Sequence, residues 1–246
     1  MTAWYKDYKA DGFAVIGVQT PEYAFEHVPG NVQAGASRLG ITYPVALDNK
    51  YTTWNNYGND SWPADYLIDS TGVVRHVSIG EGSYSATESL IRQLLMAAHP
   101  NTRLPSATQV ADTTPASPNQ TPETYLGSAR ANSYAGASGS GSHAAFAFPP
   151  TIPDNGWALS GTWSIGSQAL TANKNAAIKL NLLAGDVYLD VGGTGTITAT
   201  AGGKTATYRV SGAPDIYTLF HQPTQQHETL QVTLSPGLQA YSFTFG

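Results

Sequence analysis

The spacing of apolar and polar positions changes near the middle of the chain. In the first hundred residues, the continuous apolar run at 13–18 predicts a strand buried on both faces, and 43–47 predicts a second short strand. Residues 64–69 and 73–78 flank Ser70-Thr71-Gly72, which predicts a hairpin. Helices, or helical turns where the segment is short, are expected at residues 1–10, about 22–39, 51–57 and 87–98. This order predicts an α/β domain with parallel strands first, then the hairpin and a closing helix.

The closing helix at 87–98 carries the clearest helical pattern. Its apolar residues Leu90, Ile91, Leu94 and Leu95 lie on one face. Ser85 with Glu88 has the spacing of a capping box, which predicts where the helix begins.

The second half of the chain has the spacing of short strands. Apolar and polar residues alternate between Gly- and Pro-rich breaks at intervals of roughly ten residues, which predicts a β-sandwich or jelly roll. Gly202-Gly203 is expected to form a hairpin turn. The expected strands lie at residues 157–160, 161–165, 177–182, 187–191, 196–200, 205–210, 216–220, 229–234 and 240–245.

A proline-rich segment separates the two patterns. It shows almost no apolar periodicity, so we expect an extended linker at 99–121, between a first domain at 1–98 and a second domain at 122–246.

Composition excludes several classes of function. The formal net charge is -5 and the chain has no basic run, which argues against a nucleic-acid partner. No apolar run reaches the length of a membrane span, and the N-terminus lacks a signal-peptide pattern. Cysteine is absent, which excludes disulfides, thiolate metal sites and a cysteine nucleophile within these residues. The six histidines lack zinc-site spacing, so neither a metal nor another cofactor is expected.

Three stretches of the first half resemble the thioredoxin-like (redoxin) domain of the DipZ family of thiol–disulfide interchange proteins. They are residues 14–26, 43–54 and 62–69. Residues 217–219 and 235–246 resemble the end of the same family, in which the redoxin domain is followed by a β-sandwich resembling a carbohydrate-binding module. The resemblance implies disulfide exchange with client proteins and a link to cytochrome c biogenesis. It also implies an extracytoplasmic location, because a membrane-embedded portion lies upstream of this part in the family.

The sequence departs from the family at its beginning. Family members carry a strand and a Cys-x-x-Cys motif upstream of the segment that starts here, whereas this chain begins inside the following helix. We expect the strands near 13–18 and 43–47 to flank the position of that strand, which leaves unpaired edges. Met1 is then the start of a fragment, a mis-called start or the start of a degenerate gene. Without a thiolate, these residues are expected to be redox-inactive.

The resemblance also indicates a docking site for a client polypeptide. It implies a cis-proline loop at Trp62-Pro63; the alternative is an ordinary trans proline at the start of a strand. Thr20 and Glu22 follow the first parallel strand, so they are expected in the same cleft. Glu22 is interpreted either as a proton acceptor for a thiol or as an acid favoured at a helix N-terminus.

The aromatic residues of the second domain allow a different interpretation. Sugar-binding modules stack aromatic rings on sugars, and we select Trp157 and Trp163 as candidates because they lie near a Gly-rich loop. Asp186 and Asp190 share one face of a strand and are candidates for calcium or sugar hydroxyls. The alternative is that most of these aromatic residues belong to the core. The chain is therefore interpreted as a thioredoxin-like protein of a disulfide-exchange family, as a glycan-binding or structural interaction module, or as a non-functional fragment.

Overall fold

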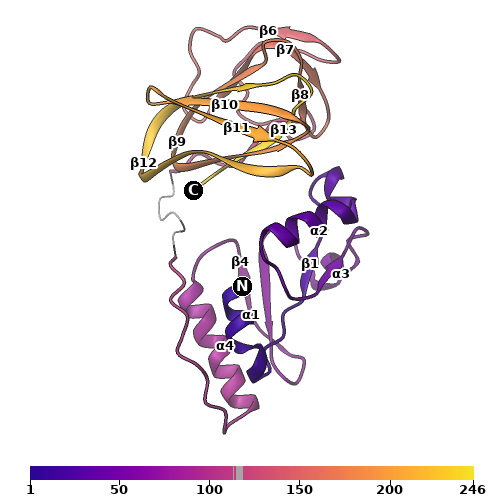
Figure 1. The fold of residues 1–246 in the computed structure, drawn as a ribbon, viewed down its shortest axis with the longest axis vertical. Coiled ribbons are helices and arrows are strands. Elements are labelled where there is room, and N and C mark those ends of the chain that lie inside the picture. Colours follow the sequence, from indigo (N-terminus) through magenta and orange to yellow (C-terminus); the bar gives the residue numbers. More distant parts are fainter. Residues whose placement is uncertain (113, 115–118) are drawn as a thin grey trace. The chain divides into compact units, whose positions relative to one another are not determined.

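The computed structural model describes residues 1–112, 114 and 119–246, and the chain divides into two compact units, Met1–Pro115 and Ala116–Gly246 (Figure 1). Each unit has its own hydrophobic core. The first contains helices and short strands and the second contains strands, so the predicted order of an α/β domain followed by an all-β sandwich domain is confirmed. Within the described residues, no helix is long and apolar enough to cross a membrane.

The first unit follows the predicted order of elements. Gly12 ends the first helical segment with a φ of 99°, and Pro29 begins α2 at its first turn, as a proline can without losing a hydrogen bond. The elements are α1 (Thr2–Tyr8), η1 (Lys9–Asp11), β1 (Gly17–Gln19), η2 (Ala24–His27), α2 (Pro29–Arg38), β2 (Val45–Leu47), α3 (Thr52–Tyr57), β3 (Ala64–Ile68), β4 (Val74–Ile79) and α4 (Tyr84–Ala98).

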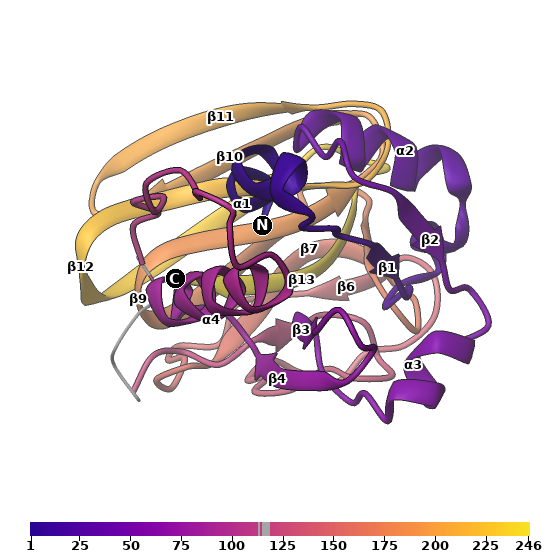
Figure 2. The ribbon, with the colours of Figure 1, turned by 90° about the horizontal axis from the view of Figure 1, so that it is seen from below.

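The strands of the first unit form two separate sheets. β1 pairs with β2 in parallel, with Gly17 opposite Val45, and β3 pairs with β4 as the predicted antiparallel hairpin. Within the described residues no ladder joins the two sheets. We expected an absent strand to lie between β1 and β2, and this is wrong because these two strands pair directly with each other. The break in hydrogen bonding instead separates the β1–β2 sheet from the β3–β4 hairpin. Figure 2 shows β1, β2 and α3 on one side of this unit and β3 and β4 near α4.

The first strand is shorter and less buried than expected. It covers Gly17–Gln19 rather than 13–18, and the side chain of Ile16 is 69% exposed. An apolar run of this kind is buried on both faces only when strands and helices surround it. Here β1 has a strand on one side alone.

The core of the first unit lies between α1 and α4. Trp4 and Tyr8 pack against Ile91 and Leu95, which confirms the predicted apolar face at these two positions of α4. The predicted capping box is wrong, because α4 begins at Tyr84 and Glu88 is a buried residue inside the helix.

Part of the predicted linker lies on the first unit. Leu104 packs against the α1–α4 core, and Thr108 donates from its backbone N–H and its hydroxyl to the Glu88 carboxylate at 2.6 and 2.7 Å. Arg92 donates to the carbonyl oxygen of Pro105 at 2.6 Å. The segment up to Thr108 is therefore held by side chains, whereas residues 113 and 115–118 of the predicted linker lie outside the described residues.

The second unit is one continuous ladder that folds back on itself. Its strand order is β11-β10-β12-β9-β13-β8-β7-β6, with β5 paired to β13. One half of β9 pairs with β7 and the other with β13, so the ladder closes around a core of alternate side chains. The strands are β5 (Thr124–Tyr125), β6 (Ala144–Phe146), β7 (Trp157–Ile165), β8 (Leu170–Ala172), β9 (Ala177–Gly192), β10 (Gly195–Ala201), β11 (Lys204–Val210), β12 (Asp215–Leu234) and β13 (Gln239–Phe245).

Several predicted strands are parts of longer ones. Residues 177–182 and 187–191 both belong to β9, and 216–220 and 229–234 both belong to β12, whose curvature is visible in Figure 2. Register shifts after Thr218 and His221 let β12 bend while it stays paired with β9. The predicted turn at Gly202-Gly203 is confirmed, since both glycines have positive φ between β10 and β11.

Candidate functional site

The carboxyl ends of β1 and β2 meet at one edge of their sheet, and Thr20 follows β1 there. Thr20 is buried, and its hydroxyl donates to the carboxylate of Asp48, which follows β2, at 3.3 Å. The backbone N–H of Asp48 donates to the carbonyl oxygen of Gln19 at 2.9 Å. Clefts of α/β sheets lie at such carboxyl ends, so this edge is where a site is expected.

Asp48 fixes the start of α3 beside this edge. Its two carboxylate oxygens accept the backbone N–H groups of Thr53 and Trp54 at 3.0 and 2.9 Å. Burial acts to raise the pKa of Asp48, but these N–H donors and the Thr20 hydroxyl outweigh it and lower the pKa. Asp48 was not among the residues predicted from the sequence, although an acid between a strand and a helix is a recognisable capping signal.

Trp62 and Pro63 lie against the same edge. The Trp62–Pro63 peptide bond is cis, as the resemblance implied. The Trp62 indole N–H donates to the carbonyl oxygen of Thr20 at 3.1 Å, and the Pro63 carbonyl accepts the Gly80 N–H at 2.9 Å. Both Trp62 and Pro63 are exposed, and the Trp62 ring lies 4.3 Å from the Trp54 ring, centroid to centroid. The structure therefore brings Trp62, Pro63 and Thr20 together.

Glu22 and Glu26 stand on the turn after Thr20. The Glu26 carboxylate accepts the backbone N–H of Glu22 at 2.9 Å and the side-chain amide of Gln19 at 3.3 Å. Burial raises the pKa of Glu26 above the usual range of a glutamic acid. Glu22 is half-buried on the same turn. Glu26, which the sequence analysis did not select, therefore holds the turn that carries Glu22.

The strands on either side of the break expose large apolar side chains. Ile16 and Val18 belong to the β1 segment, and Ile68, Val77 and Ile79 belong to the β3–β4 hairpin. Each is more than 40% exposed, with Ile79 at 54%. β-Branched side chains at these levels of exposure give the two short sheets an apolar surface.

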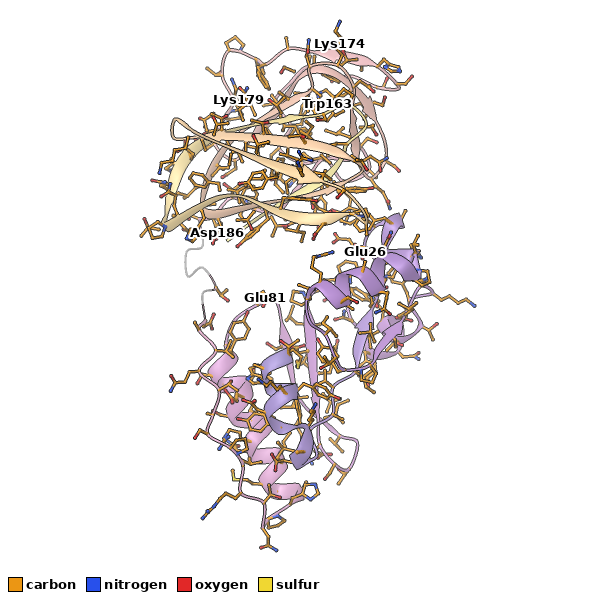
Figure 3. All side chains as sticks on the ribbon, viewed as in Figure 1. Glu26, Glu81, Trp163, Lys174, Lys179 and Asp186 are labelled. Carbon is orange, nitrogen blue, oxygen red and sulfur yellow. The ribbon has the colours of Figure 1, made fainter. Side chains whose placement is uncertain are left out.

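The two tryptophans selected for glycan binding lie in the core of the second unit, which corrects that expectation. Trp157 is 2% exposed and Trp163 is fully buried (Figure 3). Their indole N–H groups donate to the carbonyl oxygens of Asn132 and Ser160 at 2.7 and 2.8 Å. Positions 157, 159 and 163 of β7 point inward by the two-residue alternation of a strand, so neither ring presents a face to a sugar.

Asp186 and Asp190 both lie on β9, where they were considered as calcium ligands. Asp186 pairs with Nδ1 of His221 on the neighbouring strand at 2.6 Å. Among the described residues, no group of three or more His, Cys, Asp or Glu side chains comes together as metal ligands. The calcium interpretation of Asp186 and Asp190 therefore receives no support from the geometry.

An open cavity of about 640 Å³, lined mainly by residues with polar side chains, lies elsewhere on the second unit. It opens between the β10–β12 surface and the loop that joins β8 to β9. Its lining includes His143, Asn173, Lys174, Asn175, Thr196, Thr198, Thr233 and Ser235.

Comparisons with known proteins place the chain in a family. The model of the AhpC/TSA family matches residues 1–77, and that of the Thioredoxin like C-terminal domain matches residues 121–246. Protein DipZ of Mycobacterium tuberculosis and Protein DipZ of Mycobacterium bovis are each 52% identical to the chain over all of its length, which corresponds to 36% of theirs. Thiol-disulfide oxidoreductase YkuV of Bacillus subtilis is 26% identical over 37% of this chain and 62% of its own.

Among solved structures, a family two carbohydrate esterase from Cellvibrio japonicus aligns with 36% of this chain and 30% of its own, at 11% identity and a TM-score of 0.34. That likeness is too weak to support an argument about fold or ligand. The chain spans 36% of the length of the DipZ proteins that it matches. Because the model of the Thioredoxin like C-terminal domain covers half of the chain, the chain belongs to that family, and over its whole length it is homologous to the DipZ proteins.

Proposed function

We propose that the first unit is the client-docking part of an extracytoplasmic thiol–disulfide exchange site. The observation that carries the proposal is the hydrogen bond from the Trp62 indole to the Thr20 carbonyl, which holds Trp62 and Pro63 beside the carboxyl end of β1. An extended client polypeptide lies across Pro63 and the exposed Trp62 ring. Glu22, on the turn held by Glu26, is the proton acceptor.

The 246 residues contain no cysteine. In this proposal, the cysteine pair of the site belongs to a segment outside them. Supporting this, the β1–β2 sheet and the β3–β4 hairpin are separate and expose apolar side chains, as two halves of a sheet do when a strand between them is missing. One thiolate of the pair attacks the client disulfide, forms a mixed disulfide and releases a client thiolate. The second thiol, deprotonated by Glu22, then displaces the client as its dithiol and leaves the pair oxidised.

The test begins with the protein isolated from its natural host. We expect an intact mass above 26.0 kDa and, after acid trapping of thiols, two cysteines in the additional segment. A mass of 26.0 kDa with no thiol contradicts the proposal.

The docking role is tested in the same protein by its rate of exchange with a disulfide-bonded peptide. Trp62→Ala is expected to lower kcat/KM by roughly ten-fold, which corresponds to the loss of about 1.4 kcal/mol of binding in the transition state. Met96→Ala is the control, since Met96 and Trp62 are both 47% exposed but Met96 lies on α4. Equal rates for the two variants contradict docking at Trp62.

A second candidate function, favoured by the polar cavity of the second unit, is glycan binding. The hydroxyl, amide and ammonium groups around this cavity match the hydrogen-bonding groups of a saccharide. This function is independent of the cysteine pair.

A further inference from the structure

The cavity on the second unit has an unusual balance of hydrogen-bonding groups. Lys174 contributes three N–H donors and Asn175 contributes an amide, while Thr196, Thr198 and Ser235 contribute hydroxyls. Among the described lining residues there is no Asp or Glu side chain and no Trp, Tyr or Phe ring, and the lining is completed by the imidazole of His143 and the apolar side chains of Leu234 and Pro236. A site for a neutral sugar usually offers carboxylate acceptors for its hydroxyls or a ring that stacks on it. This lining instead supplies the ammonium group of Lys174, with no carboxylate to balance its charge, beside hydroxyl and amide groups that both donate and accept.

The hydroxyls of the cavity are held in fixed positions by regular strands. Thr196 and Thr198 are two residues apart on β10 and share one face of the sheet. Thr198 lies directly opposite Thr233 of β12 in the ladder. Ser235 accepts the backbone N–H of Thr196 at 3.0 Å, which joins the end of β12 to β10. The spacing of these oxygen atoms therefore follows from the backbone of the sheet.

The loop that carries Lys174 is fixed as well. The backbone N–H of Thr162 donates to the Lys174 carbonyl, and the N–H of Asn173 donates to the Thr162 carbonyl, both at 2.9 Å. The Asn173 amide donates to the Ser164 hydroxyl at 3.0 Å. Gly161 of β7 lies so close to this loop that a Cβ atom at its position would be 2.1 Å from the carbonyl oxygen of Asn175. β7 thus fixes the backbone from which Lys174 extends (Figure 3).

Lys174 has no ion-pair partner within the part of the chain that the structure describes. A cation at the edge of a cavity, with no carboxylate in the lining, attracts a negatively charged oxygen group. The side of the cavity formed by the threonines is a row of hydroxyls, which pairs with the hydroxyls of a polyol.

We propose that this cavity binds an acidic saccharide, whose oxyanion pairs with Lys174 and whose hydroxyls bind the threonine face. The proposal rests on the glycan-binding function of the second unit and names its ligand class. The oxyanion is a carboxylate or a phosphate ester, two sources of the same chemistry that the experiment separates.

The experiment is calorimetric titration of the full 246-residue chain at low salt. The probes are trigalacturonic acid, glucose 6-phosphate, the methyl ester of trigalacturonic acid and inorganic phosphate. We expect one of the two acidic saccharides to bind at least ten-fold more tightly than both the neutral ester and inorganic phosphate. Which of the two binds identifies the oxyanion.

Variants locate the site. Lys174→Gln is expected to weaken this binding by about ten-fold, the effect of losing one charge-assisted hydrogen bond. Lys174→Arg is expected to retain it. Lys204→Gln is the matched control, because it removes the same charge from the β10–β11 hairpin of the same unit. Thr198→Val, which keeps the side-chain shape, is expected to weaken binding without unfolding the strand.

Three results overturn the proposal in different ways. If the neutral ester binds as tightly as the acid, the second unit binds glycans but not through this charge. If inorganic phosphate competes equally, the cavity is an oxyanion site with no saccharide specificity. If no probe binds, or if Lys204→Gln has the same effect as Lys174→Gln, both the ligand class and the site are wrong.

Discussion

Glu88 shows what a single buried carboxylate does in the first unit. It accepts the hydroxyl of Tyr8 from α1 and both donors of Thr108 from the segment after α4. Thr108 in turn accepts the indole N–H of Trp4 at 3.1 Å. The Glu88 side chain on α4 therefore joins α1 to the segment around Thr108, twenty residues after Glu88. Removal of this carboxylate leaves the donors of Tyr8 and Thr108 without their acceptor.

Thr108→Val is expected to lower the free energy of unfolding of the first unit by about 1–3 kcal/mol, because Glu88 loses a hydroxyl donor that is not replaced by water. Urea unfolding followed by near-ultraviolet circular dichroism measures this change. Thr102→Val, in the same segment but with no side-chain hydrogen bond in the structure, is the control. Equal midpoints for the two variants contradict the role given to Thr108.

The same carboxylate makes stability depend on pH. Burial acts to raise the pKa of Glu88, but the hydrogen bonds from Tyr8 and Thr108 outweigh it and lower the pKa. A group with a lowered folded pKa stabilises the fold above its unfolded pKa and loses that contribution as pH falls through the folded value. The stability of the native chain should therefore decline below about pH 4.5 more steeply than that of Glu88→Gln. Parallel pH profiles of the two chains contradict this assignment.

At the scale of elements, β7 joins the core to the polar cavity. Trp157 and Trp163 of this strand lie in the core, while Gly161 and Thr162 hold the loop at 173–175. Gly161 has a φ of 80°, a conformation that side chains rarely adopt, and the Asn175 carbonyl blocks its Cβ position.

Gly161→Ala is expected to destabilise the second unit by about 3 kcal/mol or more, the sum of an unfavourable φ and a backbone clash. Gly212→Ala separates the two causes, since Gly212 has a φ of 89° with nothing within 4 Å of its Cβ position. Gly212→Ala should lower the free energy of unfolding of the second unit by about 1–2 kcal/mol. Thermal unfolding of both variants measures the difference, and equal costs show that the contact with Asn175 is unimportant.

Local signals in the sequence were reliable where one residue decides the backbone. Gly202-Gly203 forms the predicted turn, and Gly12 and Pro29 end and begin helical segments through their own backbone preferences. The breaks inside β9 and β12 were predicted wrongly, because a glycine such as Gly185 is compatible with a strand whose neighbours continue the ladder. Burial of Trp157 and Trp163 was also not decided by sequence, since an aromatic residue on a strand suits either face until its partners are known.

At the candidate site, the rule that ligands gather at the ends of parallel strands brought Thr20 into consideration, and the structure places Trp62 against it. Glu26 was missed because its role depends on a backbone N–H group that only the folded chain brings within reach, whereas the position of Asp48 between a strand and a helix was a local capping signal that was not used. The direct pairing of β1 with β2 was missed for the same reason, since pairing partners are set by the whole sheet.

At the scale of the whole molecule, the two units differ in how much apolar surface they bury. The second has an extensive core that includes Trp163, Ile178, Leu189 and Phe243, whereas that of the first centres on α1 and α4. The first unit also has two sheets of only two strands each, and such pairs are marginal in water.

Hydrogen exchange on the full chain should therefore show two levels of protection. Amides of β1 to β4 are expected to exchange at least about a hundred-fold faster than those of β9 and β12, since local opening follows the apolar area that holds a segment. Mass spectrometry of peptic fragments resolves these segments. Equal protection of β3–β4 and β9–β12 contradicts this difference between the two units.

The contact between Trp54 and Trp62 has an optical consequence. Their rings lie 4.3 Å apart, with planes inclined by 40°, so their electronic transitions couple in a chiral arrangement. Such a pair produces two circular dichroism bands of opposite sign, and the comparably close pair of Trp157 with Tyr134, at 4.6 Å, lies in the other unit and contains only one tryptophan. The natural sequence thus contains its own spectroscopic reporter beside Pro63, and displacement of the Trp62 ring becomes visible without a label.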